Sequence, residues 1–220
     1  MKHIAIFGGT GGLGSKLAEE LAGSFKVTAL GSKDVDVTDY SQVRAFFEEQ
    51  TVDIVLNFSG TNIDGFMHKY NSENQSNIDV QINTNIRGTI NILSCCLGQM
   101  RERGYGRIVL VSSILAHSPV VGTGVYSGCK GFIDSIVKTV ALENAAKGIT
   151  CNSLQLGYFD GGLTYRIPEE VREGIVKSIP AGRLGMIREL ANVTRMLIDT
   201  EYMNGVNLKV NGGLDIFKEM

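Results

Sequence analysis

Residues 4–14 of the chain read IAIFGGTGGLG. The apolar run Ile4–Phe7 lacks polar alternation, which is typical of a strand buried on both faces of a parallel sheet. A glycine loop follows, and residues 15–22 carry the apolar stripe of a helix. A strand, a glycine loop and a helix in this order predict a βα unit whose bared backbone amides can approach a pyrophosphate. The alternative is a tight turn that only connects the two elements.

The rest of the chain repeats this alternation of apolar runs and amphipathic segments. We expect further strands at 27–30, 54–56, 108–111, 149–154 and 206–210. We expect helices after a cap at Asp39 and at about 78–97, 126–145, 171–177 and 187–198, with a polar loop over 58–77. The pattern predicts one doubly wound α/β domain, residues 1–220, with a mostly parallel sheet and helices on both faces.

Composition excludes several classes of protein. Hydrophobic residues make up 43% and charged residues 20% of the 220, and the net charge is −2, so we expect a soluble globular protein that binds no nucleic acid. The apolar runs fall short of the roughly 20 residues that span a bilayer. We expect no signal peptide, a cytoplasmic location, four reduced cysteines and no metal site. Arg101, Arg103 and Arg107 are interpreted as a solvated surface turn.

Several polar residues follow predicted strands or share a helix face. Ser113 comes just after the strand 108–111, and ligands of open α/β sheets bind at the carboxyl ends of strands. Asn57 occupies the same place after the strand 54–56. Tyr126 and Lys130 are four residues apart at the start of a predicted helix, so both side chains lie on one face. This spacing arises readily by chance, and its value comes from the accompanying residues.

The order of these motifs resembles the short-chain dehydrogenase/reductase family. The chain has the glycine loop, the turn Asn-Phe-Ser-Gly at 57–60, Asn85 within a helix, Ser113, and the YxxxK motif of Tyr126 and Lys130. The stretches GYFD at 157–160 and GRLG at 182–185 are most similar to 3-oxoacyl-(acyl-carrier-protein) reductases and to relatives from specialised metabolism. The resemblance implies a Rossmann fold and an NAD(P)-dependent oxidoreductase that reduces a carbonyl to a secondary alcohol, or the reverse.

The resemblance also implies roles for individual residues. Tyr126 exchanges a proton with the substrate oxygen, and the Lys130 ammonium is expected to lower the tyrosine's pKa and to hold the nicotinamide ribose. Ser113 positions the substrate, and Asn85 keeps a water behind Lys130. Residues 157 to about 179 form the substrate lid. The implied cofactor-binding residues are Gly8, Thr10, Gly12, Leu13, Gly14, Ser32, Lys33, Asp36, Val37, Asn57, Ser59, Gly60, Tyr126, Lys130, Gly157 and Phe159.

The segment after the second strand bears on the choice of cofactor. Gly31–Lys33 is expected near the adenosine ribose and favours NADP(H), whereas Asp34 could bind the 2′-hydroxyl of NAD(H), which therefore stays possible. Leu30 to Asp36 is also too short for the helical crossover that normally joins parallel strands. We therefore expect the sheet to be shortened here, with a stunted third strand or none.

Three further expectations concern function and assembly. The main alternative to an enzyme is a dinucleotide-sensing regulator of the same fold, and a sugar-nucleotide epimerase would need a larger substrate lobe after Gly157. The substrate is expected to be a small carbonyl compound or alcohol, free or bound to a carrier, and the two candidates are a 3-oxoacyl thioester and a related ketone of specialised metabolism. Apolar residues beyond one stripe on both long helices, as in the family's tetramers, predict a homo-oligomer.

Overall fold

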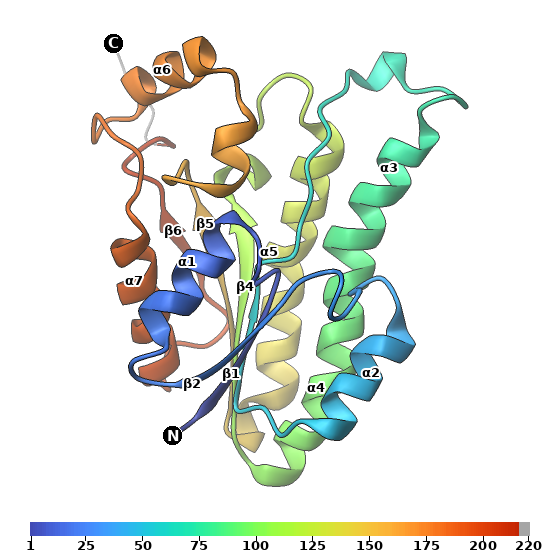
Figure 1. Ribbon diagram of the computed structural model, residues 1–220, viewed down its shortest axis with the longest axis vertical. Helices are drawn as coiled ribbons and strands as arrows, with labels where there is room; N and C mark the ends of the chain where they lie inside the picture. Colours follow the sequence, from blue (N-terminus) through green and yellow to red (C-terminus); the bar gives the residue numbers. More distant parts are fainter. Residues whose placement is uncertain (216–220) are drawn as a thin grey trace.

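Among residues 1–215, six strands form one parallel sheet in the order β2-β1-β3-β4-β5-β6 (Figure 1). The structure is a computed structural model, and it describes residues 1–215. Each neighbouring pair of strands is parallel, which confirms the doubly wound sheet. The predicted domain extends to residue 220, and residues 216–220 lie outside the described part. The strands are β1 (His3–Phe7), β2 (Lys26–Leu30), β3 (Ile54–Asn57), β4 (Gly106–Ser113), β5 (Ile149–Leu156) and β6 (Asn207–Val210).

Helices cover both faces of this sheet. Figure 1 shows α1 and α7 on one face and α2, α4 and α5 on the other, while α6 lies above the carboxyl ends of the strands. The helices are α1 (Gly12–Leu21), α2 (Tyr40–Glu49), α3 (Gln75–Ile82), α4 (Gly88–Arg103), α5 (Gly124–Asn144), α6 (Glu169–Ser178) and α7 (Ile187–Asp199). In the described residues, no helix is both long and apolar enough to cross a membrane.

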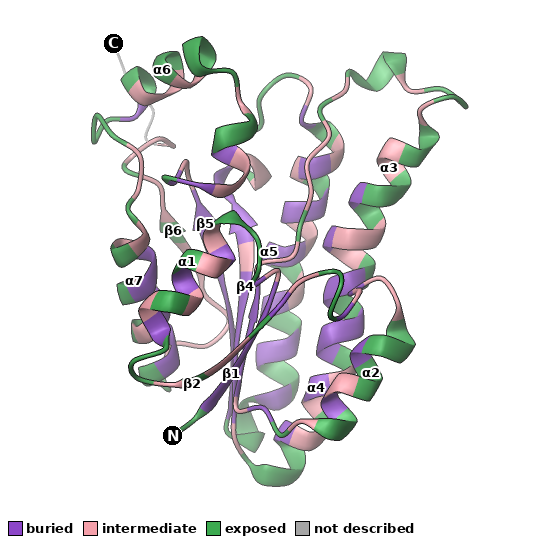
Figure 2. Ribbon diagram, viewed as in Figure 1, coloured by how far each residue is buried: buried purple, intermediate pink, exposed green. Residues whose placement is uncertain are grey.

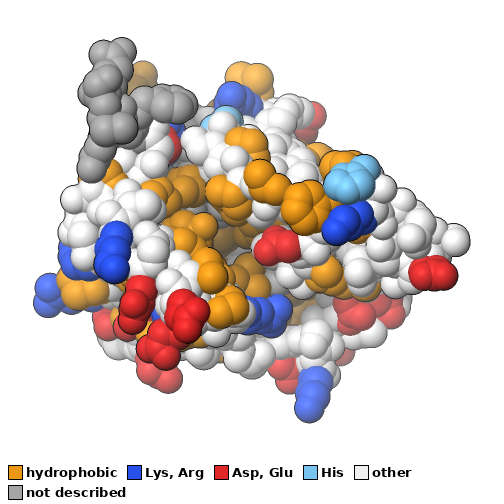
Figure 3. All heavy atoms as spheres, turned by 90° about the horizontal axis from the view of Figure 1, so that it is seen from above, with side chains coloured by type: hydrophobic (Ala, Val, Ile, Leu, Met, Phe, Trp, Pro, Cys, Tyr) orange, Lys and Arg blue, Asp and Glu red, His pale blue; other side chains and the backbone are white. Residues whose placement is uncertain are grey.

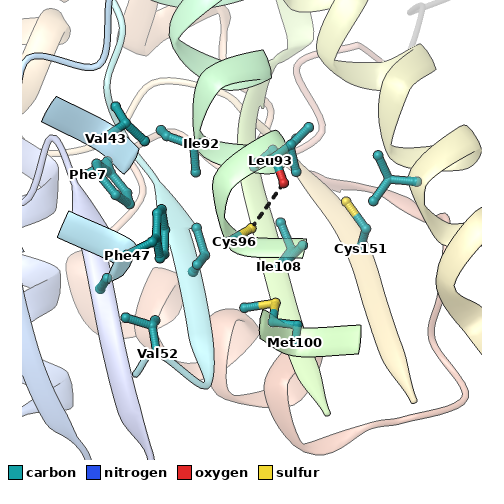
Figure 4. Close-up of a cluster of buried hydrophobic side chains, with 14 of the residues drawn as sticks. Phe7, Val43, Phe47, Val52, Ile92, Leu93, Cys96, Met100, Ile108 and Cys151 are labelled. Atoms are coloured by element: carbon teal, nitrogen blue, oxygen red, sulfur yellow. Dashed lines mark hydrogen bonds between the residues drawn. The ribbon is translucent and has the colours of Figure 1, made fainter. Parts of the chain in front are cut away.

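The central strands are buried on both faces, as their continuous apolar runs predict (Figure 2). Successive side chains of β1 point to opposite sides, so Ala5 and Phe7 join the core under α2, α4 and α5, while Ile4 and Ile6 join the core under α1 and α7. Figure 4 shows the first of these cores, where the rings of Phe7 and Phe47 lie 5.8 Å apart. The two cores hold the strand ends in fixed positions below the site.

The segment between β2 and α2 contains only turns, as the sequence predicts. No strand or helix occurs from residue 31 to residue 39. As a result β2 is an edge strand of the sheet. Asp39 caps α2 by accepting hydrogen bonds from the backbone amides of Ser41 and Gln42, as the sequence predicts.

The long helix expected at 78–97 is longer and contains an irregularity. The α3 helix continues through a π-helical segment, Asn83–Arg87, into α4, which ends at a left-handed Gly104 with φ 66°. A π-helical turn holds one extra residue and is frequent at functional sites. Asn85 lies inside this segment and is buried.

Arg107 corrects one interpretation of the sequence. It is not part of a solvated turn, because its side chain is only 2% exposed at the start of β4. Its guanidinium donates to the carbonyls of Ile198 and Gly148 at 3.1 and 2.9 Å and pairs with Glu201. Residues 106–113 are buried almost throughout, on both faces of the sheet, and the guanidinium's partners come from distant segments that a charge count does not show.

Candidate active site

A cavity of about 640 Å³ lies at the carboxyl ends of β1, β3, β4 and β5. This volume is in the range of small-molecule and cofactor sites. Figure 3 views this end of the molecule and shows hydrophobic side chains around a central hollow. The glycine loop borders the cavity together with Ser113, Tyr126 and Lys130. The site therefore forms where an open α/β sheet is expected to bind its ligand.

The glycine loop makes a cradle that side chains would fill. Gly8 has φ 74°, and a Cβ there would lie 2.5 Å from the backbone of Phe58. A Cβ on Gly14 would lie 2.2 Å from the Gly8 oxygen, and one on Gly12 would lie 2.6 Å from the backbone of Gly162. The absence of side chains bares the first amides of α1, and these fit a pyrophosphate.

Ser113, Tyr126 and Lys130 come together as the motifs predict. Ser113 ends β4 and the other two lie on the first turns of α5; the three are 8%, 9% and 3% exposed. The Lys130 ammonium nitrogen lies 5.4 Å from the centre of the Tyr126 ring and donates to the Val111 carbonyl at 2.8 Å. The Ser113 hydroxyl accepts a hydrogen bond from the Leu115 amide at 3.1 Å. A phenol, a hydroxyl and an ammonium thus border one cavity.

The acid–base state of Tyr126 differs from the expectation. Burial raises the pKa of its phenol above the ordinary value, and the interaction with the Ser113 hydroxyl lowers it only in part. The ammonium does not reverse this effect, because it is directed at the Val111 carbonyl. In this state the tyrosine is a protonated donor at neutral pH, and the expected lowering of its pKa by Lys130 is wrong.

The pKa of Lys130 is shifted in the opposite direction, to a lower value. Burial lowers the pKa of its ammonium to about 8, and the interactions with Cys129 and Asp134 oppose this change. The lowered value follows from desolvation, which disfavours a charged group. A buried lysine of this kind changes its charge near physiological pH.

Asn85 lies directly behind this group. Its amide nitrogen donates to the carbonyls of Thr61 and Gln81, each at 2.8 Å. Its side-chain oxygen is buried without a hydrogen-bond partner. A Cβ on Gly60 would lie 2.8 Å from this oxygen and 3.5 Å from the Lys130 nitrogen, so both atoms face Gly60. The π-helical segment therefore directs the unpaired Asn85 oxygen toward the same point of the Gly60 turn as the Lys130 ammonium nitrogen.

Asn57 has a supporting position. Its amide nitrogen donates to the Thr89 hydroxyl at 3.0 Å, and its oxygen accepts from the backbone amide of Ser59 at 3.0 Å. Asn57 thus shapes the turn 57–60 from beneath and does not itself border the cavity.

The structure places most of the predicted cofactor residues around the cavity and leaves three predicted site residues outside its wall. Asn57 and Asn85 lie behind the lining, and Lys33 is exposed beyond it. The predicted residues that line the cavity are Gly8, Thr10, Gly12, Leu13, Gly14, Ser32, Asp36, Val37, Ser59, Gly60, Ser113, Tyr126, Lys130, Gly157 and Phe159.

The segment after β5 closes over the glycine loop. The Lys16 ammonium donates to the Asp160 carbonyl at 2.9 Å, and the 3₁₀ turn Gly162–Arg166 lies against α1. Leu163 and Ile167 border the cavity, as expected of a lid, but Tyr165 does not, since its hydroxyl bonds to Asp160 and its ring stacks on Arg172.

The cavity also contains residues that the sequence analysis did not assign. Asn62 and Asp64 border it from the loop after β3, and Asn62 donates to Asp64 at 2.9 Å. Tyr158 borders it from the loop after β5, and burial together with the Asp64 charge raises the pKa of this phenol. The position of Tyr158 beside Gly157 could have indicated it, whereas nothing in the polar loop 58–77 distinguishes Asn62 or Asp64.

Comparisons with known proteins agree with this geometry. Residues 6–215 match the family model described as enoyl-(acyl carrier protein) reductase. The chain is 36% identical over 165 residues to an acetoacetyl-CoA reductase of Rhizobium meliloti (strain 1021), covering 74% of this chain and 67% of that protein. It is 28% identical to a 3-oxoacyl-(acyl-carrier-protein) reductase of Haemophilus influenzae, covering 97% of this chain and 98% of that protein.

A solved structure shares the whole fold. The structure of ElxO with NADP bound superposes with a TM-score of 0.86 at 23% sequence identity, covering 97% of this chain and 98% of that chain. The sheet, its flanking helices and the segment after β5 are thus those of a known architecture.

Proposed function

The chain belongs to the short-chain dehydrogenase/reductase family, and on that basis we propose that it is an NADPH-dependent reductase of 3-oxoacyl thioesters. Its action as an NAD(P)-dependent oxidoreductase follows from the reductases to which it is similar. The cofactor, the substrate and the residue roles given below are our proposal.

One observation carries this proposal. Ser113 of β4 and both Tyr126 and Lys130 of α5 border the same cavity as the glycine loop, which lies at the start of α1. A dinucleotide whose pyrophosphate lies on the α1 amides extends along this cavity toward the phenol. When bound, the nicotinamide supplies a hydride to the carbonyl carbon of the substrate. The chain's own groups must then bind the carbonyl oxygen and protonate it.

Tyr126 is the proton donor in this proposal. Its raised pKa keeps the phenol protonated at neutral pH, which is the form that a reduction needs. The Ser113 hydroxyl, which already receives the Leu115 amide, can donate its own proton to the same substrate oxygen. Together the two hydroxyls orient the carbonyl and stabilise the negative charge that develops on its oxygen.

Lys130 and Asn85 restore the proton. The Lys130 pKa of about 8 lets it pass a proton toward Tyr126 near neutral pH. The unpaired oxygen of Asn85 faces the same point of the Gly60 turn as the lysine nitrogen, and it fits a water molecule held between the two. This arrangement supports the role that the family resemblance implies for Asn85.

The adenosine end of the cavity favours NADP(H) over NAD(H). Ser32 borders the cavity and Lys33 is the next exposed residue, so a hydroxyl and an ammonium are available for a 2′-phosphate. Asp34, the competing ligand for a 2′-hydroxyl, accepts the Gly31 amide at 2.8 Å and does not border the cavity. Its carboxylate is thus used within the turn.

The substrate class rests on the relatives and on the lid. The similar proteins are named for acetoacetyl-CoA and 3-oxoacyl-carrier substrates. Leu163 and Ile167 offer an apolar wall for an acyl chain, and Arg166 beside them offers a cation for the phosphate of a thioester carrier. The dinucleotide-sensing alternative gains no support, because Ser113, Tyr126 and Lys130 are present and meet in one cavity.

We also propose a homo-oligomer formed through the two long helices. Ile90 on α4 and Leu142 on α5 are exposed apolar residues, at 44% and 84%. The cytoplasmic location stays a prediction from the sequence.

The experiment that tests the function is a comparison of the native protein with Tyr126→Phe. With acetoacetyl-CoA and NADPH, kcat should fall by about 10²–10⁴-fold. The Kd for NADPH, measured by the quenching or enhancement of its fluorescence, should change little. Turnover that survives in Tyr126→Phe would remove the phenol from the mechanism, and a native protein inactive toward all 3-oxoacyl thioesters would refute the substrate class.

A further inference from the structure

The carboxylate of Asp134 is buried one helical turn after Lys130 on α5 and has no part in the chemistry described so far. We propose that Asp134 is a positioning residue that acts through Lys130, a carboxylate held in place one helical turn away that favours the charged form of the lysine ammonium. This inference rests on the proposed function, because it assigns the support of a group used there.

Asp134 is fixed by contacts from three directions. It is 4% exposed, and its carboxylate accepts the Ser153 hydroxyl at 3.1 Å and the Gln155 amide nitrogen at 2.7 Å, both from β5. The His117 ring nitrogen Nε2 lies 3.0 Å from the same carboxylate. Asn207 of β6 donates to the Asp134 backbone carbonyl at 3.0 Å. A charge buried this deeply needs such partners, and both carboxylate oxygens have them.

The position of Asp134 along α5 places its carboxylate on the same helix face as Lys130. Asp134 follows Lys130 by four residues, so the two side chains are neighbours on one face of the helix. Both are buried, and low dielectric strengthens the attraction between opposite charges. The negative charge of Asp134 accordingly acts against the burial that lowers the Lys130 pKa.

The other groups around the pair do not replace this charge. On α5 the titratable neighbours of Lys130 are Tyr126 and Cys129, while Val111 of β4, the Gly60 turn and Asn85 present neutral oxygens or backbone. Around Asp134 the titratable neighbour from another element is His117. Among the described residues whose charges act on Lys130, Asp134 is thus the one carboxylate.

His117 covers the carboxylate on its solvent side. Its side chain is 54% exposed, and its Nε2 lies 2.7 Å from the Gln155 amide nitrogen. His117 is not among the groups whose charges act on Lys130, so its substitution leaves the carboxylate itself in place.

The test follows the Lys130 ammonium directly by NMR. Lysine is labelled with ¹³C at Cε, the Lys130 resonance is assigned by its loss in Lys130→Met, and its titration is recorded in the native protein, Asp134→Asn and His117→Gln. We expect the midpoint to move to lower pH by roughly half a unit or more in Asp134→Asn, since an opposite charge is removed. His117→Gln is the matched control, and its midpoint should stay at the native value.

A kinetic readout accompanies the titration. The alkaline limb of kcat/KM, where the lysine loses its proton, should move to lower pH in Asp134→Asn together with the NMR midpoint. Equal midpoints in native protein and Asp134→Asn would overturn the inference, as would an equal shift in His117→Gln, which would trace the effect to packing. The NMR result does not require turnover, so an inactive native protein would refute the proposed function alone.

A second variant keeps the test decisive if Asp134→Asn fails to fold, and circular dichroism checks the folding of both variants. Asp134→Ser removes the charge and keeps an oxygen for Gln155, and it should shift the midpoint in the same direction. Unfolding of both variants would make Asp134 a residue of the core alone and would overturn the inference.

Discussion

The two ends of the cavity differ in how deeply their side chains are held. Around β4 and α5, Ser113, Tyr126 and Lys130 are all less than a tenth exposed. At the β2 end, Ser32, Lys33 and Asp34 are all exposed, and no further strand within the described part of the chain covers the edge. The reacting end is therefore set by burial and by contacts with several elements, whereas the adenosine end depends on a few solvated side chains.

This contrast predicts unequal consequences of mutation. Removing a buried group alters desolvation and hydrogen bonding, which carry large energies, while exposed charges are screened by water and salt. Substitutions at the reacting end should change rates by orders of magnitude, and substitutions at the adenosine end should change preference by small factors.

The largest effect is expected for Lys130→Met. The kcat/KM of the proposed reductase should fall by about 10²–10⁴-fold, because the proton relay loses its cation. The unliganded protein should nevertheless become more stable at pH 7, by up to about 3 kcal/mol, since the lysine's pKa falls from 10.5 to about 8 on folding. Urea unfolding measures this gain, and Lys138→Met, an exposed change on the same helix, should show neither effect.

The same lysine predicts how stability depends on pH. Between about pH 8 and 10.5 the unfolded chain binds a proton at this site that the folded chain has lost, so the native protein's stability should rise across that window. Below pH 8 both states are protonated and the full cost of burying the ammonium remains. Lys130→Met should lack this rise, and a rise of equal size in the variant would assign it to other groups.

An intermediate effect is expected for Gly12→Ala. The new Cβ would lie 2.6 Å from the backbone of Gly162, so the segment after β5 must move off the glycine loop. The Kd for NADPH should rise by roughly tenfold, or about 1.4 kcal/mol. The control is Gly23→Ala, where a Cβ meets no atom within 4 Å. An unchanged Kd in Gly12→Ala would show that cofactor binding does not need the closed segment.

The smallest effect is expected for Lys33→Ala. The ratio of kcat/KM for NADPH to that for NADH should fall by about threefold, because an exposed ion pair contributes up to about 1 kcal/mol. The effect should weaken further in high salt. The exposed Lys26 at the other end of β2 provides the control, and an unchanged ratio in Lys33→Ala would remove this lysine from cofactor selection.

Much of the fold could be predicted from local sequence. The unbroken apolar runs at β1, β3 and β4 predict buried parallel strands, and the five residues between Leu30 and Asp36 leave no room for a crossover helix. The site residues Ser113, Tyr126 and Lys130 could be placed together because each follows a strand end or opens a helix at the same edge of the sheet.

Other features of the fold and the site could not be predicted, because they depend on tertiary contacts that no local sequence pattern reports. The raised pKa of Tyr126 results from burial by several elements, and the sequence shows only the neighbouring lysine that would lower it. The partners named above for Arg107 and Asp134 lie between 17 and 94 residues away in the chain. The π-helical turn at Asn85 is an excess of one residue, which helix periodicity over 78–97 does not reveal.

That extra residue determines how α3 is rotated about the helix axis relative to α4. An α-helix advances by about 100° per residue, so the π-helical segment offsets the faces of α3 and α4 relative to a regular helix. Asn85 can then face Gly60 while Ile92 and Cys96 of α4 still enter the core. Deleting one residue there would restore regular α-helical winding. Either the Asn85 amide or the core-facing side of α4 would then be misaligned, so the number of residues in this segment is constrained as strictly as their identity.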